Sequence, residues 1–198
     1  MDAIQLLKND HVKVRGLLEQ LGNTTSRAEK TRTELLAKIN KELEIHTTIE
    51  EEIFYPAFRE AAKNAEDREM FFEAIEEHHA AGDLVLPDLL GTDVESDKFG
   101  GRAKVLKELV EHHADEEEKE MFPRARKAMD KDELRSLGAA FNRMARDLES
   151  MERERAMVLA GISHDLRTPL SRLRLALEMS GAESGAATAM NEDIGEID

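Results

Sequence analysis

Two histidine–glutamate pairs with helical spacing are the residues in this chain best suited to metal chemistry. His46 and Glu50 lie four positions apart, as do His113 and Glu117. In an α-helix this spacing places both side chains on one face, one turn apart. Imidazole and carboxylate together suit iron, manganese or zinc, and a carboxylate can bridge two cations. Each pair therefore predicts half of a metal-binding site.

An internal repeat with a constant offset along the chain relates the two pairs and adds two further histidines. The same offset relates Tyr55 to Phe122 and Pro56 to Pro123. Two equivalent helical hairpins would place their equivalent half-sites face to face. The predicted metal ligands are the six residues that the repeat pairs in this way, namely His11, His46, Glu50, His78, His113 and Glu117.

The apolar spacing predicts the elements that position these ligands. Residues 2–21, 28–62, 66–90 and 99–128 are expected to be helical, because apolar side chains recur in steps of three and four. The short polar or glycine-containing breaks between them favour antiparallel neighbours. We therefore predict an all-α fold in which an up-down-up-down four-helix bundle is followed by one long signalling helix.

The histidines and glutamates occupy positions on the apolar stripes where a bundle core is expected. A single histidine on such a stripe is more often a satisfied core residue than a ligand. Six such residues at one phase of a duplicated hairpin are different, because burying two unpaired ionised carboxylates costs several kcal/mol each. A pair of cations removes that cost, so the pattern indicates metal binding.

The segment 1–130 resembles the hemerythrin-like family of cation-binding domains. The resemblance implies two iron ions, bridged by oxo or hydroxo and by carboxylates and capped by histidines. Oxygen carriers of this family have a further histidine one turn after the ligand at His78, where this chain has Gly82. The resemblance therefore implies a sensor or stress-response type that binds oxygen, nitric oxide or another small ligand. Its motifs here are Asp10-His11, His46 to Glu52 with Phe54-Tyr55-Pro56, Glu77-His78, and His113 to Glu117 with Met121-Phe122-Pro123.

The apolar stripe continues after residue 130 as one long helix, interrupted by Pro169, where we expect a kink. This seam finds no obvious partner in the first bundle, so it predicts a coiled coil between two chains, and hence a homodimer. Its residues step by three and four, namely Leu134, Leu137, Phe141, Met144, Leu148 and Met151.

Residues 163–170, Ser-His-Asp-Leu-Arg-Thr-Pro-Leu, resemble the phosphoacceptor box of osmosensor-type bacterial sensor histidine kinases. The resemblance implies that His164 accepts the γ-phosphate of ATP, that Asp165 acts as base or orients the ring, and that Thr168 positions water for dephosphorylation of a response regulator. Phe141 to Ala145 resembles the second helix of a HAMP linker. We thus expect a bundle over 1–130, a HAMP-like linker over 131–152 and a truncated dimerisation segment over 153–198.

The kinase-like segment leaves the function open between several classes of protein. The chain ends at Asp198 without a glycine-rich ATP-binding domain, so it is not expected to be a self-sufficient kinase, and its status as an enzyme is uncertain. It is interpreted first as a di-iron sensor coupled to a phosphoacceptor. The alternatives are a kinase fragment in a phosphorelay served by an ATP domain in trans, and an iron-handling or stress-repair protein with a vestigial C-terminus.

Composition argues against several classes of binding partner, metal site and location. The formal net charge of −15 disfavours nucleic acid and anionic lipid as partners. The absence of cysteine excludes disulfides and thiolate metal sites. Apolar runs fall short of the roughly 18 residues of a membrane span, and the N-terminus lacks a signal pattern. A soluble cytoplasmic protein is therefore expected.

Overall fold

The computed structural model describes residues 1–62 and 64–179, and over these ranges the chain is helical with no strand. Four antiparallel rods form the first part of the chain, at the places that the apolar spacing predicts. The first rod is α1 (Ala3–Gly22) and the second joins α2 (Glu29–Ile49), η1 (Glu50–Phe54) and α3 (Tyr55–Ala61). The third joins α4 (Ala65–His78), η2 (His79–Val85) and α5 (Leu86–Leu90), and the fourth joins α6 (Asp97–Glu116), η3 (Glu117–Met121) and α7 (Phe122–Ala128).

Polar caps begin three of these rods. The side chain of Asp2 accepts a hydrogen bond from the backbone N–H of Gln5, and Asn64 does the same for Asp67. Ser96 caps α6 through the N–H of Phe99. These contacts satisfy backbone donors that have no partner inside the first turn, and so they fix where each rod starts.

A π-helical segment interrupts each of the last three rods, and a proline follows each segment by two residues. Pro56, Pro87 and Pro123 stand at the beginning of α3, α5 and α7. Proline lacks the N–H of an α-helical bond, and its ring crowds the carbonyl four residues earlier. A wider turn before the proline relieves that crowding and inserts one residue into the helix.

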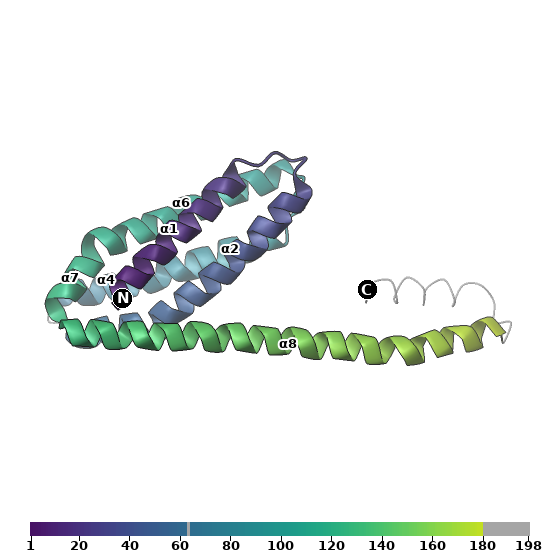
Figure 1. Ribbon diagram of the computed structural model, residues 1–198. Coiled ribbons are helices and arrows are strands. Elements are labelled where there is room, and N and C mark those ends of the chain that lie inside the picture. Colours follow the sequence, from purple (N-terminus) through teal and green to yellow (C-terminus); the bar gives the residue numbers. More distant parts are fainter. Residues whose placement is uncertain (63, 180–198) are drawn as a thin grey trace. The chain divides into compact units, whose positions relative to one another are not determined.

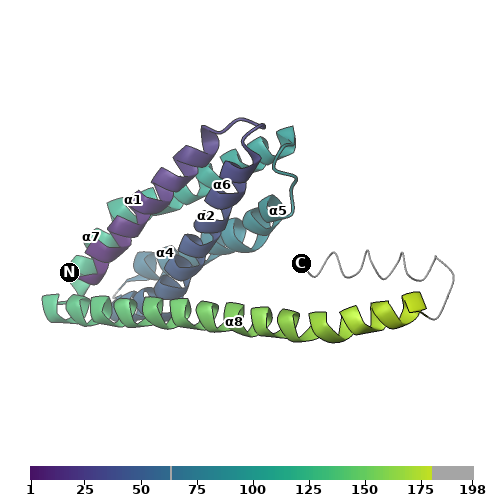
Figure 2. The same cartoon turned by 45° about the vertical axis from the view of Figure 1, so that its right-hand side comes forward.

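The rods pack so that α1 lies against both α2 and α6, as Figures 1 and 2 both show. Two hydrophobic clusters fill the interior on either side of the predicted ligands. One cluster gathers Leu18, Ile39 and Leu106 near the α1–α2 connection. The other gathers Phe54, Phe58 and further aromatic residues near the N-terminus. The all-α bundle that the sequence predicts is therefore confirmed.

The long helix α8 spans Lys131–Met179 and continues through Pro169. Its first turns correct the prediction that its whole seam faces a second chain. Leu134 and Phe141 are each only 3% exposed and belong to the same cluster as Phe54, with Leu137 and Met144 packed against it. The prediction was wrong here because the start of α8 packs into the same cluster as Ala3 and Phe58 of the bundle, and its Gly138 lies close to the backbone of Met1 and Ala3.

The chain divides into two compact units, Met1–Ala145 and Arg146–Asp198, and the first contains the whole predicted metal site. Beyond Ala145 several apolar residues among the described side chains of α8 are exposed, including Met151, Val158 and Ile162. None of the helices in the described ranges is long and apolar enough to cross a membrane.

Candidate metal centre

All six predicted ligands come together in the interior of the bundle. His11 lies on α1, His46 on α2, His78 on α4 and His113 on α6, while Glu50 and Glu117 begin η1 and η3. Both carboxylates are buried, Glu50 fully and Glu117 to within 2%. Their ligation of a metal remains a prediction, and the geometry around them shows what that metal would meet.

Each glutamate lies between one histidine from each hairpin. The Oε2 atom of Glu50 is 3.1 Å from His46 Nε2 and 3.3 Å from His78 Nε2. The Oε2 atom of Glu117 is 3.1 Å from His11 Nε2 and 3.7 Å from His113 Nε2. The repeat relates these two groupings, so each carboxylate lies between histidines of the two hairpins.

The ligand atoms form two groups that share Glu50. In one group, atoms of His11, His46, Glu50 and Glu117 lie within 4.8 Å of one another, and in the other the same holds for Glu50, His78 and His113. Two groups with a shared carboxylate are the arrangement that a pair of cations needs.

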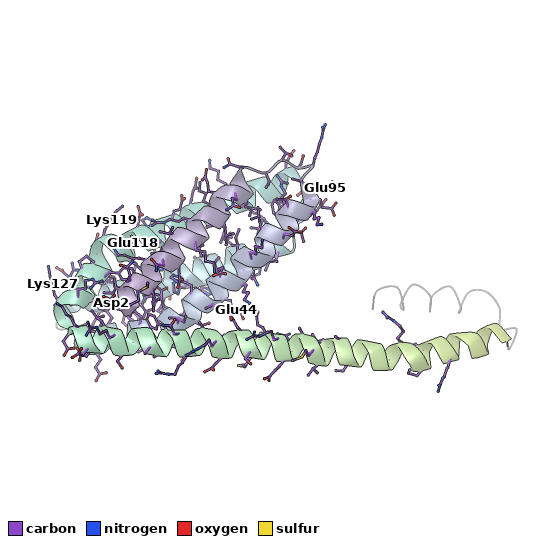
Figure 3. The ribbon with its side chains drawn as sticks, viewed as in Figure 1. Asp2, Glu44, Glu95, Glu118, Lys119 and Lys127 are labelled. Atoms are coloured by element: carbon purple, nitrogen blue, oxygen red, sulfur yellow. The ribbon has the colours of Figure 1, made fainter. Side chains whose placement is uncertain are left out.

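Carboxylates outside the centre orient the histidine rings, and these residues were missed in the sequence. His11 Nδ1 is 3.0 Å from Glu118 Oε1, and His78 Nδ1 is 2.8 Å from Glu51 Oε1. Glu51 and Glu118 look like solvated-face residues in the sequence, and Figure 3 shows Glu118 on the fourth rod. A carboxylate on Nδ1 fixes the tautomer that leaves Nε2 free to bind a cation.

The repeat also relates these orienting residues, and it is the signal that could have found them. The offset that pairs the ligands also connects Glu51 with Glu118 and Asp10 with Glu77. Glu77 Oε2 is 2.7 Å from His113 Nδ1, whereas Asp10 Oδ2 is 4.0 Å from His46 Nδ1. The two halves therefore share one plan, with the contact to His46 longer than a hydrogen bond.

Tyr55 is a seventh polar residue of the centre, and it makes the two halves unequal. Its hydroxyl donates to Glu117 Oε1 at 3.0 Å and lies 3.3 Å from Nε2 of both His78 and His113. In an α-helix a residue five positions after Glu50 would face elsewhere, but the π turn of η1 brings Tyr55 onto the ligand face. The repeat partner, Phe122, instead stacks on His11 at 5.7 Å.

Burial and mutual proximity shift the pKa values of the predicted ligands in different directions. Burial and the neighbouring Glu117 raise the pKa of Glu50 well above its usual value. Burial also works to raise the pKa of Glu117, but His113 and His11 outweigh it and lower that pKa to about 2. Burial lowers the pKa of His46 to about 4, so its ring is neutral and offers a lone pair.

Unpaired buried atoms support the fit to a metal. His11 Nε2, Glu50 Oε1 and Glu117 Oε2 form no hydrogen bond, although each is enclosed by protein. His11 Nε2 and Glu117 Oε2 are close but do not have hydrogen-bond geometry, as expected for two lone pairs that point toward a common cation. Buried polar atoms without partners are otherwise strongly disfavoured.

Removal of the Tyr55 hydroxyl tests the inequality of the two halves. Tyr55→Phe keeps the packing of the ring but removes the donor to Glu117, and loss of such an outer partner weakens metal binding by about 10- to 100-fold. We expect one of two irons to bind about tenfold more weakly in a competition titration with a chelator. Phe71→Leu, which alters a ring beside Tyr55, serves as the packing control. Iron affinities in Tyr55→Phe that equal those of the unaltered protein would contradict this role.

A small cavity adjoins the centre. It has a volume of about 30 Å³, and the histidines share its wall with Val14, Leu43, Ala81, Gly82 and Val110. A side chain in place of Gly82 would meet nothing within 4 Å, so this wall is open. The volume suits one or two small molecules, and the lining is mainly apolar.

The predicted phosphoacceptor residues lie far along the chain from this centre. His164, Asp165 and Thr168 fall within the backbone of α8, while their side chains lie outside the described part of the structure. Residues 180–198 of the predicted dimerisation segment are likewise outside it. His79 and His112, in contrast, are exposed and pair with Asp83 and Glu116.

Known families match both parts of the chain. Residues 2–125 match the hemerythrin HHE cation binding domain, and residues 154–196 match the His Kinase A (phospho-acceptor) domain. The first match covers more than half of the sequence. The chain therefore belongs to the hemerythrin HHE cation-binding family, and it carries a histidine kinase phospho-acceptor domain after the bundle.

Individual relatives divide in the same way. The uncharacterized protein Rv2633c of Mycobacterium tuberculosis is 31% identical over 123 residues, which are 62% of this chain and 71% of that protein. The crystal structure of its HHE domain-containing homolog from Mycobacterium kansasii has a TM-score of 0.64 and 29% identity, over 74% of this chain and 86% of that one.

The kinase-like part matches two sensor proteins of Escherichia coli. Sensor protein RstB is 44% identical over 63 residues, which are 31% of this chain. Sensor histidine kinase CpxA is 43% identical over 53 residues, which are 27% of it. The chain spans only 14% of the length of RstB and 12% of CpxA.

Proposed function

We propose that this protein binds two iron ions in the bundle and passes their redox or ligand state along α8 to the phosphoacceptor His164. Two groups of buried histidines that share a carboxylate support binding of a metal pair. A di-iron centre supplies reversible redox chemistry and open coordination positions for oxygen, nitric oxide or a similar small molecule. The adjoining apolar cavity supports a ligand of that size.

The observation that carries the proposal is the shared core between the centre and the start of α8. Tyr55 and Phe122, which touch the ligands, belong to the same hydrophobic cluster as Leu134 and Phe141 of α8. Packed clusters shift between discrete arrangements rather than deforming continuously. A change in the position of Glu117 or His11 therefore reaches the output helix through the side chains that pack between them.

The test measures iron and phosphotransfer in the same preparation. We expect two irons per chain and a visible absorption that differs between anaerobic and aerated samples. With labelled ATP and the separate ATP-binding domain of a sensor kinase, labelling should require His164 and should change at least about twofold between oxidised and reduced iron, a modest coupling free energy. Equal labelling in both iron states, or the absence of iron, would contradict the proposed sensor.

A second candidate function is that of a phosphoacceptor alone, served in trans by an ATP-binding domain. The match of residues 154–196 to the phospho-acceptor domain favours it. Such a protein would use a response regulator as partner and pair with a second chain through the exposed stripe of α8. It predicts labelling of His164 that does not depend on iron, and the same experiment separates the two.

A further inference from the structure

A second cavity also reaches the metal centre, and although it shares Glu77 and His113 with the apolar one, the rest of its wall has a different character. It lies between α4 and the α6–η3 segment and has a volume of about 160 Å³. Carboxylates dominate its wall, and neither lysine nor arginine is among the described residues that line it. These carboxylates are Glu73, Glu77, Glu116, Glu117 and Glu120.

The pseudo-symmetry of the fold shows that this acidic lining is not a requirement of the bundle. The repeat relates Glu73 to Leu6 and Glu120 to Ile53, which pack against the hydrophobic cluster. It relates Glu116 to the buried Ile49. The equivalent gap in the first hairpin is therefore apolar and filled, whereas the gap in the second hairpin is acidic and open.

The inner wall of this cavity consists of predicted ligands. His113 and Glu117 both line it, although they are only 7% and 2% exposed. The Oε2 atom of Glu117 forms no hydrogen bond. Because His113 and Glu117 belong both to this wall and to the predicted ligand set, the acidic cavity offers a cation a path to the centre.

Glu77 connects the outside of the path with the centre. Its Oε2 atom accepts from His113 Nδ1 at 2.7 Å, while its Oε1 atom lies 3.6 Å from Nε2 of the exposed His112. His112 Nε2 is also 3.4 Å from Glu116 Oε1. Ligand atoms of Glu77, His112 and Glu116 lie within 4.8 Å of one another, and an imidazole with two carboxylates suits a first-row divalent cation.

We propose that this cavity is the entry route for divalent transition-metal cations, which Glu77, His112 and Glu116 bind first at the surface. The proposal rests on the metal centre proposed above. Clefts lined by one sign of charge raise the local concentration of the opposite ion and its rate of association, by tenfold or more. The other cavity is smaller, about 30 Å³, and Glu77 is the one carboxylate among the described residues that line it, whereas five carboxylates line the acidic cavity.

The test measures the rate of iron uptake rather than its end point. Ferrous ammonium sulfate is mixed anaerobically with the metal-free full chain, and a chelator stops uptake at successive times. Glu73→Gln/Glu116→Gln/Glu120→Gln keeps side-chain size and leaves His113 with its partner Glu77. We expect uptake to slow by about tenfold at low ionic strength, with two irons per chain at the end, and added salt should slow the unaltered protein.

A matched variant controls for the loss of three negative charges. Glu34→Gln/Glu44→Gln/Glu95→Gln removes exposed carboxylates, of which Glu44 and Glu95 are labelled in Figure 3 on other parts of the bundle. This control should load iron at the rate of the unaltered protein. Equal slowing of both variants, or no slowing of the first, overturns the entry route. If the unaltered protein fails to bind iron, the proposed metal centre is overturned instead. If only the first variant ends with fewer than two irons per chain, its carboxylates belong to the centre, and the entry route is overturned.

Discussion

His113→Ala is expected to abolish stoichiometric iron binding and to lower the melting temperature of the iron-loaded protein by roughly 10 °C. A metal present at about a thousand times its dissociation constant stabilises a fold by about 4 kcal/mol, and for this chain length 1 kcal/mol shifts Tm by about 2–4 °C. His113 contributes one of the Nε2 atoms near Glu117 and is only 7% exposed. Its removal leaves both a missing ligand and a cavity.

The measurement combines iron analysis with thermal unfolding of loaded and metal-free samples. His46→Ala should behave in the same way, because the repeat makes it the equivalent ligand of the other hairpin. His79→Ala is the matched control, since His79 is the exposed neighbour of the predicted ligand His78, and its iron content should not change. His164→Ala should likewise keep iron and stability. A His113→Ala protein that still binds two irons would refute the assigned ligand set.

The ligands could be predicted from sequence because spacing and repetition constrain them twice. The four-residue interval fixes one helical face for His46 and Glu50, and the internal repeat reproduces that face at His113 and Glu117. Helix boundaries followed from apolar steps and short breaks, and the structure places them within a few residues of the prediction. Local periodicity was sufficient wherever the backbone stayed close to an α-helix.

Prediction failed where the helix departs from that geometry. Tyr55 lies five positions after Glu50, and only the π turn brings both to the centre. The prolines two residues after each π segment carry this information, although α-helical periodicity does not use it. Glu51 and Glu118 look solvent-facing in the sequence because each directly follows a ligand, and consecutive side chains of an α-helix point about 100° apart around its axis. In the structure they nevertheless reach His78 and His11 across the bundle.

The prediction for the apolar stripe of α8 failed for a different reason, because tertiary contacts decide which surface buries it. A stripe with steps of three and four predicts a buried face but does not identify what buries it. For Leu134 and Phe141 the partner is the bundle of the same chain, whereas Met151 and Val158 are exposed among the residues that the structure describes. One stripe thus has a buried part in the bundle and an exposed part beyond it, and the proposed transmission along α8 depends on this division.

Phe141→Ala is expected to separate the iron centre from the output without removing the iron. Truncation of a buried phenylalanine lowers the free energy of unfolding by about 3 kcal/mol or more. Phe141 lies in the cluster that contains Tyr55 and Phe122 but does not contact the predicted ligands in any interaction seen among the described residues. Iron should therefore stay at two per chain, while labelling of His164 should no longer depend on the iron state.

Gly138→Val disturbs the same packing of the start of α8 against the bundle, but through the backbone. A Cβ atom at position 138 would lie 3.0 Å from the N atom of Ala3 and 3.1 Å from the O atom of Met1, and backbone cannot move aside as a flexible side chain does. The start of α8 must shift, so this variant should reproduce the phenotype of Phe141→Ala. Met157→Ala, at an exposed position of the same helix, should leave both stability and iron dependence unchanged. If labelling of His164 still depended on the iron state in both Phe141→Ala and Gly138→Val, the signal would have to leave the bundle by a path other than its packing against α8.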